Sequence, residues 1–278
     1  MLSDADMRTF DQIKRYYEIE KKLANRLRRA TQSERQQLYV EVYDEFLTTL
    51  ANDSSAPSND LTLQAGRTRS QMKFLQRFLY PEAVFLELGS SSCRMAIEVA
   101  KHVNKVYAVD VSFGTVDRSS LPPNLECVEF DGLHLPVAPE SIDIAYSHQV
   151  IEHVHPEDAI DQLAEIYRVL ATGGKFVCVT PNRLNGPHDE SRMFDAVATG
   201  FHLKEYTIAE LVQLLRQSGF SKVVAYTGGR GYYMGCPPVA LSLFEAAFSL
   251  LPWKWRTSWG AYFPVRPLLA IRLVGWKL

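Results

Sequence analysis

Residues 83–112 read AVFLELGSSSCRMAIEVAKHVNKVYAVDVS, and this stretch decides the fold class of the chain. An apolar run ends at a turn that begins with Gly89, a helical pattern follows, and a second apolar run ends at Asp110. Two apolar strands that flank one helix are typical of a parallel pair with a crossover connection. Ligands bind at the carboxyl ends of strands in open parallel sheets, so Gly89 and Asp110 mark a candidate binding edge.

The same alternation of strands and helices continues along the chain. Short apolar runs predict four more strands, over residues 127–130, 142–147, 175–181 and 222–229. A helical pattern follows Pro156, and Thr207 forms a capping box with Glu210 at the start of another helix. The predicted fold class is therefore α/β, with a Rossmann-like, mostly parallel sheet that carries helices on both faces over residues 81–230.

The two ends of the chain differ from this central part. Residues 1–80 show a helical pattern with capping motifs at Ser33 and Thr68, and polar breakers over residues 51–60 predict a linker. Residues 231–278 contain all four tryptophans and several basic residues. We expect a helical N-terminal extension that acts as a lid and an aromatic-rich, basic C-terminal appendage.

Composition excludes several classes of protein. The net charge of −2 does not indicate a nucleic-acid partner. No apolar run reaches the roughly 18 residues of a membrane span, and the N-terminus lacks the pattern of a signal peptide. The four cysteines form no C-x-x-C pair, which predicts reduced thiols. We therefore expect a cytoplasmic protein; the pattern does not predict its oligomeric state.

The C-terminal segment leaves two interpretations open. It contains no acidic residue after Glu245, while tryptophans and basic residues continue to the end. An amphipathic cap packed on the domain is favoured, because exposed aromatic stripes are rarer than buried ones. The alternative is a weak contact with a membrane surface, which would make the protein peripheral to a membrane.

The turn and the acid after the second strand indicate the kind of cofactor. Asp110 lies 21 residues after Gly89, where a carboxylate can accept hydrogen bonds from both hydroxyls of a ribose. The G-x-G-x-x-G fingerprint of dinucleotide sites is missing, since Gly89 is the one glycine of the turn. Glu87 precedes the turn and suits an ammonium group better than a pyrophosphate. These residues favour S-adenosylmethionine (SAM) over NAD and make an oxidoreductase the least favoured class.

Residues 83–182 resemble the class I SAM-dependent methyltransferases, in the group typified by small-molecule enzymes. VFLELGSSSC is similar to the first motif of that family, and VYAVDVS is similar to its ribose-binding strand end. The segments FDGLHLPVAPESIDIAYSHQVIEHV and LAEIYRVLATGGKFVCVTPN resemble the following strands and helix. The chain departs from the family at two positions, because Ser91 and Cys93 replace glycines that are usual there.

The resemblance implies a set of cofactor-binding residues. Glu87 and Gly89 would face the methionine part of SAM, and Asp110 would hold the ribose. Asp131 would accept from the adenine amino group, although Asp131 followed by Gly132 is also the composition of a plain turn. The full set that the resemblance implies is Glu87, Gly89, Ser91, Cys93, Asp110, Val111, Asp131, Gly132, Ser147 and His148.

Methyl transfer to oxygen benefits from a general base, and histidines suit that role. We expect His188, oriented by Asp189 in the long loop after residue 181, or else His153, to be this base. The alternative for His153 is that it packs or caps a turn. A metal site is not expected, because the local histidines His148, His153 and His155 lack the helical i, i+4 spacing of a zinc pair.

The sequence thus predicts a SAM-dependent methyltransferase whose acceptor is a small molecule or glycan, with oxygen as the favoured atom. The first alternative is C-methylation of a quinone-like, lipophilic acceptor, which the aromatic C-terminus would suit. The second is a SAM-binding scaffold without catalytic activity, since two of the usual motif glycines are replaced.

Overall fold

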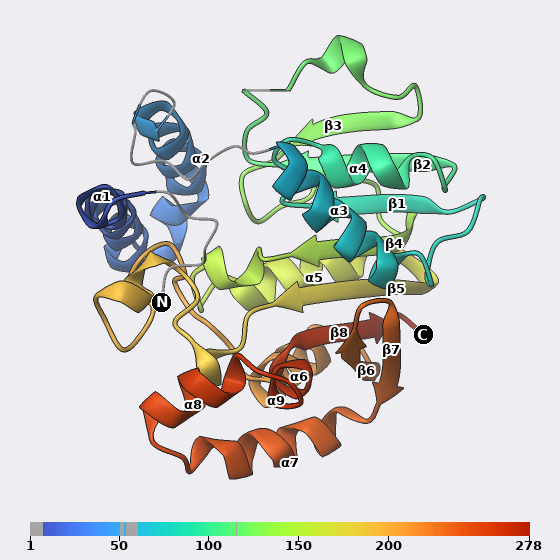
Figure 1. Ribbon diagram of the computed structural model, residues 1–278. Helices are drawn as coiled ribbons and strands as arrows, with labels where there is room; N and C mark the ends of the chain where they lie inside the picture. Colours follow the sequence, from blue (N-terminus) through green and yellow to red (C-terminus); the bar gives the residue numbers. More distant parts are fainter. Residues whose placement is uncertain (1–7, 51–52, 54–60, 115) are drawn as a thin grey trace.

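An eight-stranded sheet forms the centre of the protein (Figure 1). The computed structural model describes residues 8–50, 53, 61–114 and 116–278. The strand order is β3-β2-β1-β4-β5-β8-β6-β7. The strands span β1 Val84–Leu88, β2 Lys105–Asp110, β3 Leu125–Glu129, β4 Ile142–His148, β5 Leu170–Thr180, β6 Lys222–Gly229, β7 Tyr232–Cys236 and β8 Ile271–Trp276.

Strand directions confirm the predicted Rossmann-like, mostly parallel sheet. The first five strands pair in parallel. Strand β8 pairs antiparallel with both β5 and β6, so β6 runs in the same direction as the first five strands. Strand β7 is antiparallel to β6. The order changes direction at β1, since β2 lies on one side of it and β4 on the other, and ligands bind at such a point in open sheets.

Helices cover both faces of this sheet, as the sequence predicts. Helices α3 (Leu61–Leu75) and α4 (Arg94–Val99) cover one face, where Phe85, Ile144 and Val177 are buried against them. Helices α5 (Ala159–Val169) and α6 (Ile208–Gln217) cover the other face and contribute Leu163 and Leu211 to its core. Figure 1 shows α3 and α4 in front of the strands and α5 behind them.

The N-terminal region is helical, but two of its helices begin at other residues than the capping motifs predict. Helix α2 (Gln32–Leu50) begins after Thr31, whose backbone N–H donates to Glu34 at 2.8 Å. Thr68 lies inside α3 and donates its hydroxyl to the Gln64 carbonyl, a bond that satisfies a threonine within a helix. A capping motif alone therefore did not identify the helix start. The predicted linker over residues 51–60 lies outside the described residues, apart from Asp53.

The C-terminal segment is part of the sheet, which corrects the division at residue 230. Strand β8 lies between β5 and β6, and β7 extends the edge beyond β6. The aromatic and basic composition of this segment suggested an appendage. Composition alone does not reveal which strands pair with one another. The outer part is a set of three helices at the bottom of Figure 1, α7 (Pro238–Ser249), α8 (Trp253–Gly260) and α9 (Val265–Leu269). No helix of the described residues is both long and apolar enough to cross a membrane.

Candidate functional site

A cavity of about 290 Å³ lies at the carboxyl ends of β1, β2 and β4. Its sheet side carries Gly89 and Asp110, the two residues that end the first pair of strands. Its opposite side comes from α2, which lies with α1 (Phe10–Arg29) next to the sheet in Figure 1. The cavity therefore lies at the switch point of the sheet and is covered by the N-terminal region.

Gly89 lets the backbone turn directly beneath the cavity. Its φ is +73°, in the region that glycine adopts without steric cost. A Cβ at this position would lie 2.5 Å from Cγ2 of Val150 on the loop after β4. The N–H groups of Gly89 and Ser90 both donate to the Val109 carbonyl, at 2.8 and 3.1 Å, which ties the turn to β2. A side chain at residue 89 would therefore fill space that the two loops need.

Gly89→Ala is expected to lower the free energy of unfolding by about 2–4 kcal/mol, from the left-handed backbone and the overlap with Val150. Gly173→Ala is the matched control, because Gly173 also has a positive φ (+82°) but has no atom within 4 Å of the added Cβ. That control should lose about 1–2 kcal/mol, the backbone cost alone. Urea unfolding measures both values. Equal losses would show that Val150 gives way to the methyl group.

Asp110 joins the end of β2 to the turn after β1. Its Oδ2 accepts from the Ser91 N–H at 2.6 Å, and its Oδ1 accepts from the Val111 N–H at 2.7 Å. Burial raises the pKa of this carboxyl, and the backbone donors oppose that effect. Each carboxylate oxygen keeps a second lone pair, and the side chain lies on the cavity wall. Ser91 and Val111 line the same cavity, so the structure brings these predicted residues together.

The Asp131–Gly132 segment contributes only its glycine to the cavity wall. The Asp131 carboxylate accepts from the N–H groups of Leu133 and His134 at 2.8 and 2.7 Å, and its other oxygen lies 2.9 Å from Nδ1 of His134. These bonds are those of a turn, which agrees with the alternative interpretation of this dipeptide. Gly132 has a φ of +94° and packs under Tyr39 of α2, where a Cβ would be 3.1 Å away.

Four other predicted residues do not line the cavity. The Glu87 carboxylate is buried below the turn and accepts from the Ser90 hydroxyl at 2.7 Å, and burial raises its pKa to about 8. Cys93 points into the core on the α3–α4 face, and its Sγ is 3.6 Å from Sγ of Cys127. The local backbone explains this direction, because Cys93 adopts a φ of +56° as the residue before α4.

Ser147 and His148 end β4 but do not line the cavity either. The Ser147 hydroxyl is buried and lies 3.7 Å from Sγ of Cys178 on the neighbouring strand. Burial lowers the pKa of His148 to about 4, so this side chain is neutral at pH 7. The next residue, Gln149, turns with a φ of +58° and does line the cavity. Sequence spacing located this strand end correctly, but the turn decides which side chain faces the cavity.

One wall of the cavity comes from α2, within the N-terminal extension that was expected to act as a lid, but none of its lining residues was predicted. Tyr39, Tyr43, Phe46 and Leu47 line it. The ring of Phe201 stacks on Tyr43 with centroids 5.3 Å apart, so the wall is supported by the loop before α6. The i, i+4 and i, i+3 spacing of these side chains was the available signal, since it places them on one helical face.

A buried ion pair holds this wall in place. Nε of Arg35 lies 2.6 Å from Oδ2 of Asp158, and Nη2 lies 2.8 Å from Oδ1. Both side chains are almost fully buried, at 1% and 0% exposure. The Tyr39 hydroxyl donates to Oδ2 of Asp158 at 2.8 Å. Asp158 precedes α5, so the pair fastens α2 to the loop that leads into α5.

The predicted pairing of His188 with Asp189 is wrong. The Asp189 carboxylate accepts from the backbone N–H groups of Ser191 and Gly200, at 3.1 and 3.0 Å, and caps a short 3₁₀ helix. Nε2 of His188 lies 3.0 Å from the Asn182 carbonyl, and the ring does not line the cavity. Neighbouring N–H groups in the sharply turned loop satisfy the carboxylate, so Asp189 has no role in orienting the adjacent ring.

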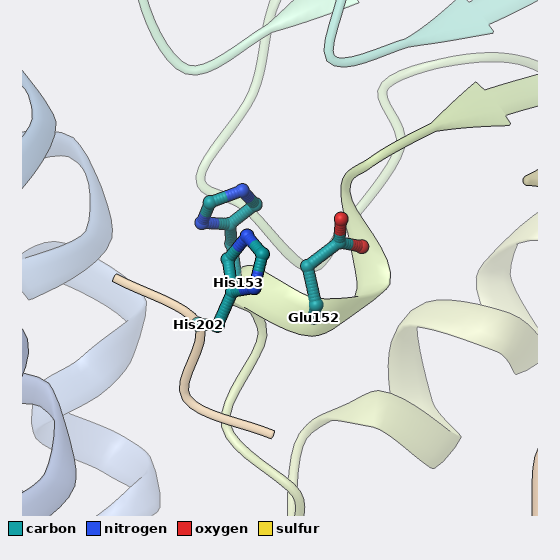
Figure 2. Close-up of side chains that lie close together, drawn as sticks. All are labelled: Glu152, His153 and His202. Atoms are coloured by element: carbon teal, nitrogen blue, oxygen red, sulfur yellow. The ribbon is translucent and has the colours of Figure 1, made fainter. Parts of the chain in front are cut away.

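His153 is the predicted base that the structure places on the cavity wall. Its Nδ1 lies 3.1 Å from the Phe201 carbonyl, and burial lowers its pKa to about 3. The ring is therefore neutral at pH 7, with Nδ1 as the donor and Nε2 as the free acceptor. It meets the His202 ring edge-on at 4.9 Å, and Glu152 lies beside both (Figure 2). Sequence analysis missed His202 and Glu152, since nothing local pairs residues 50 positions apart.

Comparison with known sequences identifies the central part of the chain. Residues 86–178 match a family described as a methyltransferase domain. A "Probable S-adenosylmethionine-dependent methyltransferase" of Mycolicibacterium smegmatis is 31% identical over 136 residues, which cover 49% of this chain and 51% of that protein. A relative from Mycobacterium tuberculosis with the same description is 31% identical over 139 residues, 50% of this chain and 48% of that protein. The chain thus spans about half the length of the curated relatives that it matches.

Comparison with solved structures supports the fold. A SAM-dependent methyltransferase of Thermotoga maritima superposes with a TM-score of 0.53 at 16% identity and covers 95% of this chain and 100% of that chain. The (4+2)-cyclase SpnF superposes with a TM-score of 0.56 at 18% identity, over 87% of this chain and 96% of that one. Both likenesses concern the fold alone, and the second shows that this fold also carries chemistry other than methyl transfer.

Proposed function

We propose that this chain is a class I SAM-dependent methyltransferase that transfers a methyl group from SAM to a hydroxyl of a small-molecule or glycan-like acceptor; the methyltransferase-domain match and the similar relatives support this proposal. The observation that carries the proposal is that the Asp110 carboxylate and the Gly89 turn, which has no side chain, both line the cavity. A carboxylate at this strand end can hold the ribose hydroxyls, and the turn leaves room for the methionine part.

The residues of the cavity fit SAM. Gly89 and Gly132 leave space that a Cβ would fill, against Val150 on one side and Tyr39 on the other. Asp110 would hold the ribose, while Val111 and Gly132 would border the adenine. When bound, SAM supplies a methyl group on a positively charged sulfur, which a nucleophile can displace in line. Metal ions are not needed for that displacement itself.

The protein's own contribution is to exclude water and align the acceptor. The α2 wall covers the cavity with Tyr39, Tyr43 and Phe46, and such a wall keeps water from the reacting groups. The buried pair of Arg35 and Asp158 fixes the position of this wall before any ligand binds. Alignment of the acceptor with the methyl group lowers the activation barrier, because the reactants are already held in the geometry of the displacement.

The lining of the cavity supports an acceptor hydroxyl. Nε2 of His153 has no intramolecular hydrogen bond shown in the described structure and can accept from a hydroxyl placed in the cavity. The alternative acceptor, a lipophilic quinone-like ring, is supported by the apolar side chains of Phe46, Phe130 and Val154 on the same walls.

Two measurements test the proposal. Calorimetry with S-adenosylhomocysteine (SAH), the demethylated product, measures whether the cavity binds the nucleoside. Incubation with isotope-labelled SAM and a panel of sugars, hydroxylated aromatics and quinone-like rings then measures methyl transfer, and mass spectrometry identifies the methylated atom. We expect SAH binding and a labelled methyl ether. Binding without transfer to any class would instead support the scaffold alternative, and a new C–CH₃ bond would support the lipophilic acceptor.

We further propose that the outer C-terminal helices contact an anionic membrane surface. The outer C-terminal segment carries aromatic and aliphatic side chains that are each more than half exposed, namely Leu250, Trp255, Trp259, Tyr262 and Phe263. Lys254 and Arg256 lie among them, and the chain has no acidic residue after Glu245. Exposed aromatic and aliphatic side chains next to basic residues suit the interface of a membrane with negatively charged lipids.

Replacing both Leu250 and Phe263 by serine is expected to reduce binding to anionic vesicles about tenfold or more, because two apolar side chains no longer enter the interface. Flotation with vesicles of phosphatidylglycerol and phosphatidylcholine measures the bound fraction. Phe10→Ser is the matched control, since Phe10 is 55% exposed but lies on α1. Deletion of residues 246–278 would be unsuitable because it removes β8 from the sheet. Unchanged flotation of the double variant would contradict the proposal.

A further inference from the structure

Two buried side chains, Glu152 and His202, converge with half-buried His153, which lines the cavity. One ring nitrogen of His153, one of His202 and one carboxylate oxygen of Glu152 all lie within 4.8 Å of one another. Glu152 and His153 come from the short 3₁₀ helix Ile151–His153 after β4, and His202 comes from the loop before α6. Figure 2 shows the two rings side by side with the carboxylate next to them. Glu152 is fully buried and His202 is 8% exposed. The grouping is therefore not the common gathering of polar side chains on an exposed surface.

Each of these side chains is oriented by a second partner on its other side. Nδ1 of His153 lies 3.1 Å from the Phe201 carbonyl, and Nδ1 of His202 lies 2.7 Å from Oε1 of Glu205. The Thr180 hydroxyl donates to Oε2 of Glu152 at 2.8 Å. These bonds leave Nε2 of each ring and Oε1 of Glu152 as the free atoms. Metal-binding histidines have this arrangement, in which the second ring nitrogen donates to a carbonyl or carboxylate.

The free carboxylate oxygen lacks any partner. Oε1 of Glu152 is buried and makes no hydrogen bond in the described structure. In the part of the chain that the structure describes, neither Glu152 nor Glu205 forms an ion pair with a lysine or arginine. A buried carboxylate is costly unless it is paired, hydrogen-bonded or bound to a metal. The cluster and the adjacent Glu205 together place two buried carboxylates next to two histidines, a grouping that one cation would stabilise.

We propose that Glu152, His153 and His202 bind one divalent transition-metal ion, of the class of Zn²⁺ and Fe²⁺. Two imidazoles and one carboxylate are a ligand set that leaves a further coordination position open, and imidazole favours these ions over Mg²⁺ and Ca²⁺. Zinc bonds of about 2.0–2.2 Å place neighbouring ligand atoms roughly 3.4 Å apart. Atoms within 4.8 Å reach that spacing through small rotations of the three side chains.

The position of the ion gives it a role in catalysis, and this step rests on the proposed function. With the ion bound, Nε2 of His153 would be a ligand and would no longer accept from the hydroxyl. Because His153 lines the cavity, an acceptor hydroxyl there would lie next to the ion. An acceptor hydroxyl bound to such an ion would have a lower pKa and would release its proton to solvent more readily. The oxygen then forms a bond to the methyl carbon, the carbon–sulfur bond breaks, and its electron pair stays on sulfur, which becomes a neutral thioether.

Spacing along the chain does not predict this site, because its ligands do not all lie close together in the sequence. His148 and His155 do not belong to the cluster. The ligand set instead joins two neighbouring residues to His202, which the fold brings beside them.

Zinc binding by the full chain tests the proposal. The protein is freed of metal with a chelator, titrated with Zn²⁺ by calorimetry, and its retained zinc is measured by elemental mass spectrometry after dialysis. We expect one ion per chain in the wild type. Glu152→Gln and His202→Gln should each weaken binding by about 100-fold or more, since loss of a ligand exceeds the 10–100-fold cost of losing an orienting partner. His155→Gln is the matched control and should bind as the wild type does, because its ring faces Glu157 outside the cluster.

Thermal unfolding gives a readout that does not depend on activity. Zinc at about 100 times its dissociation constant should raise the Tm of the wild type by about 4 °C or more and leave both ligand variants unchanged. Absence of zinc binding by the wild type would overturn the proposal, whether or not the variants fold. Equal zinc affinity in the wild type and the folded Glu152→Gln variant would overturn it as well. Retained SAH binding in either case would leave the methyltransferase assignment intact, whereas zinc binding without SAH binding would refute only that assignment.

Discussion

Asp110→Ala is expected to weaken SAH binding by about 100-fold or more. The carboxylate would accept charge-assisted hydrogen bonds from both ribose hydroxyls, and each such bond contributes about 1.5–3 kcal/mol. A loss of about 3–6 kcal/mol corresponds to at least a hundredfold change in affinity. The same substitution frees the N–H groups of Ser91 and Val111, so the turn after β1 loses its link to the end of β2. Calorimetry with SAH measures the effect.

Glu129→Ala is the matched control for that substitution. Glu129 ends the neighbouring strand β3, and its Cα pairs in register with that of Asp110, but its side chain is exposed and does not line the cavity. The control should bind SAH with the affinity of the wild type. Asp110→Asn adds a second test. Its amide keeps one acceptor oxygen, so its affinity for SAH should lie between those of the wild type and Asp110→Ala. An Asp110→Ala variant that folds and binds SAH normally would remove the basis of the proposed cofactor site.

Arg35→Met is expected to lower the free energy of unfolding by about 3–5 kcal/mol. Removing one partner of a buried ion pair leaves the other charge uncompensated. Asp158 would remain buried at 0% exposure, with the Tyr39 hydroxyl as its remaining side-chain donor. Tyr39 packs on Gly132 at the cavity, so a shift of α2 should also weaken SAH binding. Urea unfolding measures the stability, and calorimetry measures the affinity.

The control for this prediction is Arg26→Met on the preceding helix. Arg26 pairs with Glu45 and, at 3.7 Å, with Glu41, but these side chains are 38–61% exposed. Exposed ion pairs contribute about 0–1 kcal/mol, so this variant should unfold almost as the wild type does. A loss in Arg35→Met no larger than in the control would mean that water or a local rearrangement compensates Asp158, and that α2 is held by its apolar contacts instead.

The fold class followed from local patterns that survive in the tertiary structure. The run from residue 83 to Asp110 predicted two parallel strands and a crossover helix, and β1, α4 and β2 form there. Thr207 and Glu210 form the predicted capping box of α6. Strand and helix periodicity depend on the residues themselves and their near neighbours, which is why a sequence can reveal them. The same argument placed Gly89 and Asp110 on the binding edge, because strand ends in a parallel sheet lie together.

Such local patterns did not predict the direction of the side chains at the turns. Cys93 and Gln149 both have a positive φ, and this local geometry points one side chain into the core and lets the other line the cavity. Asp131 and Asp189 carry carboxylates that seemed available for a ligand or a histidine. In the folded chain, nearby backbone N–H groups bind both of them. Whether such a carboxylate binds a ligand or the nearby backbone depends on distances in the folded chain, which the sequence does not give.

The sequence by itself determined the fold class of the protein, the binding edge of its sheet and the position of the first turn, because these depend on contacts between near neighbours. Only the tertiary structure decided what surrounds that edge. It brought the α2 wall over the cavity, inserted β8 between β5 and β6, and placed His202 beside Glu152 and His153. Each of these contacts joins segments far apart in the chain, and their pairing depends on how the whole core packs.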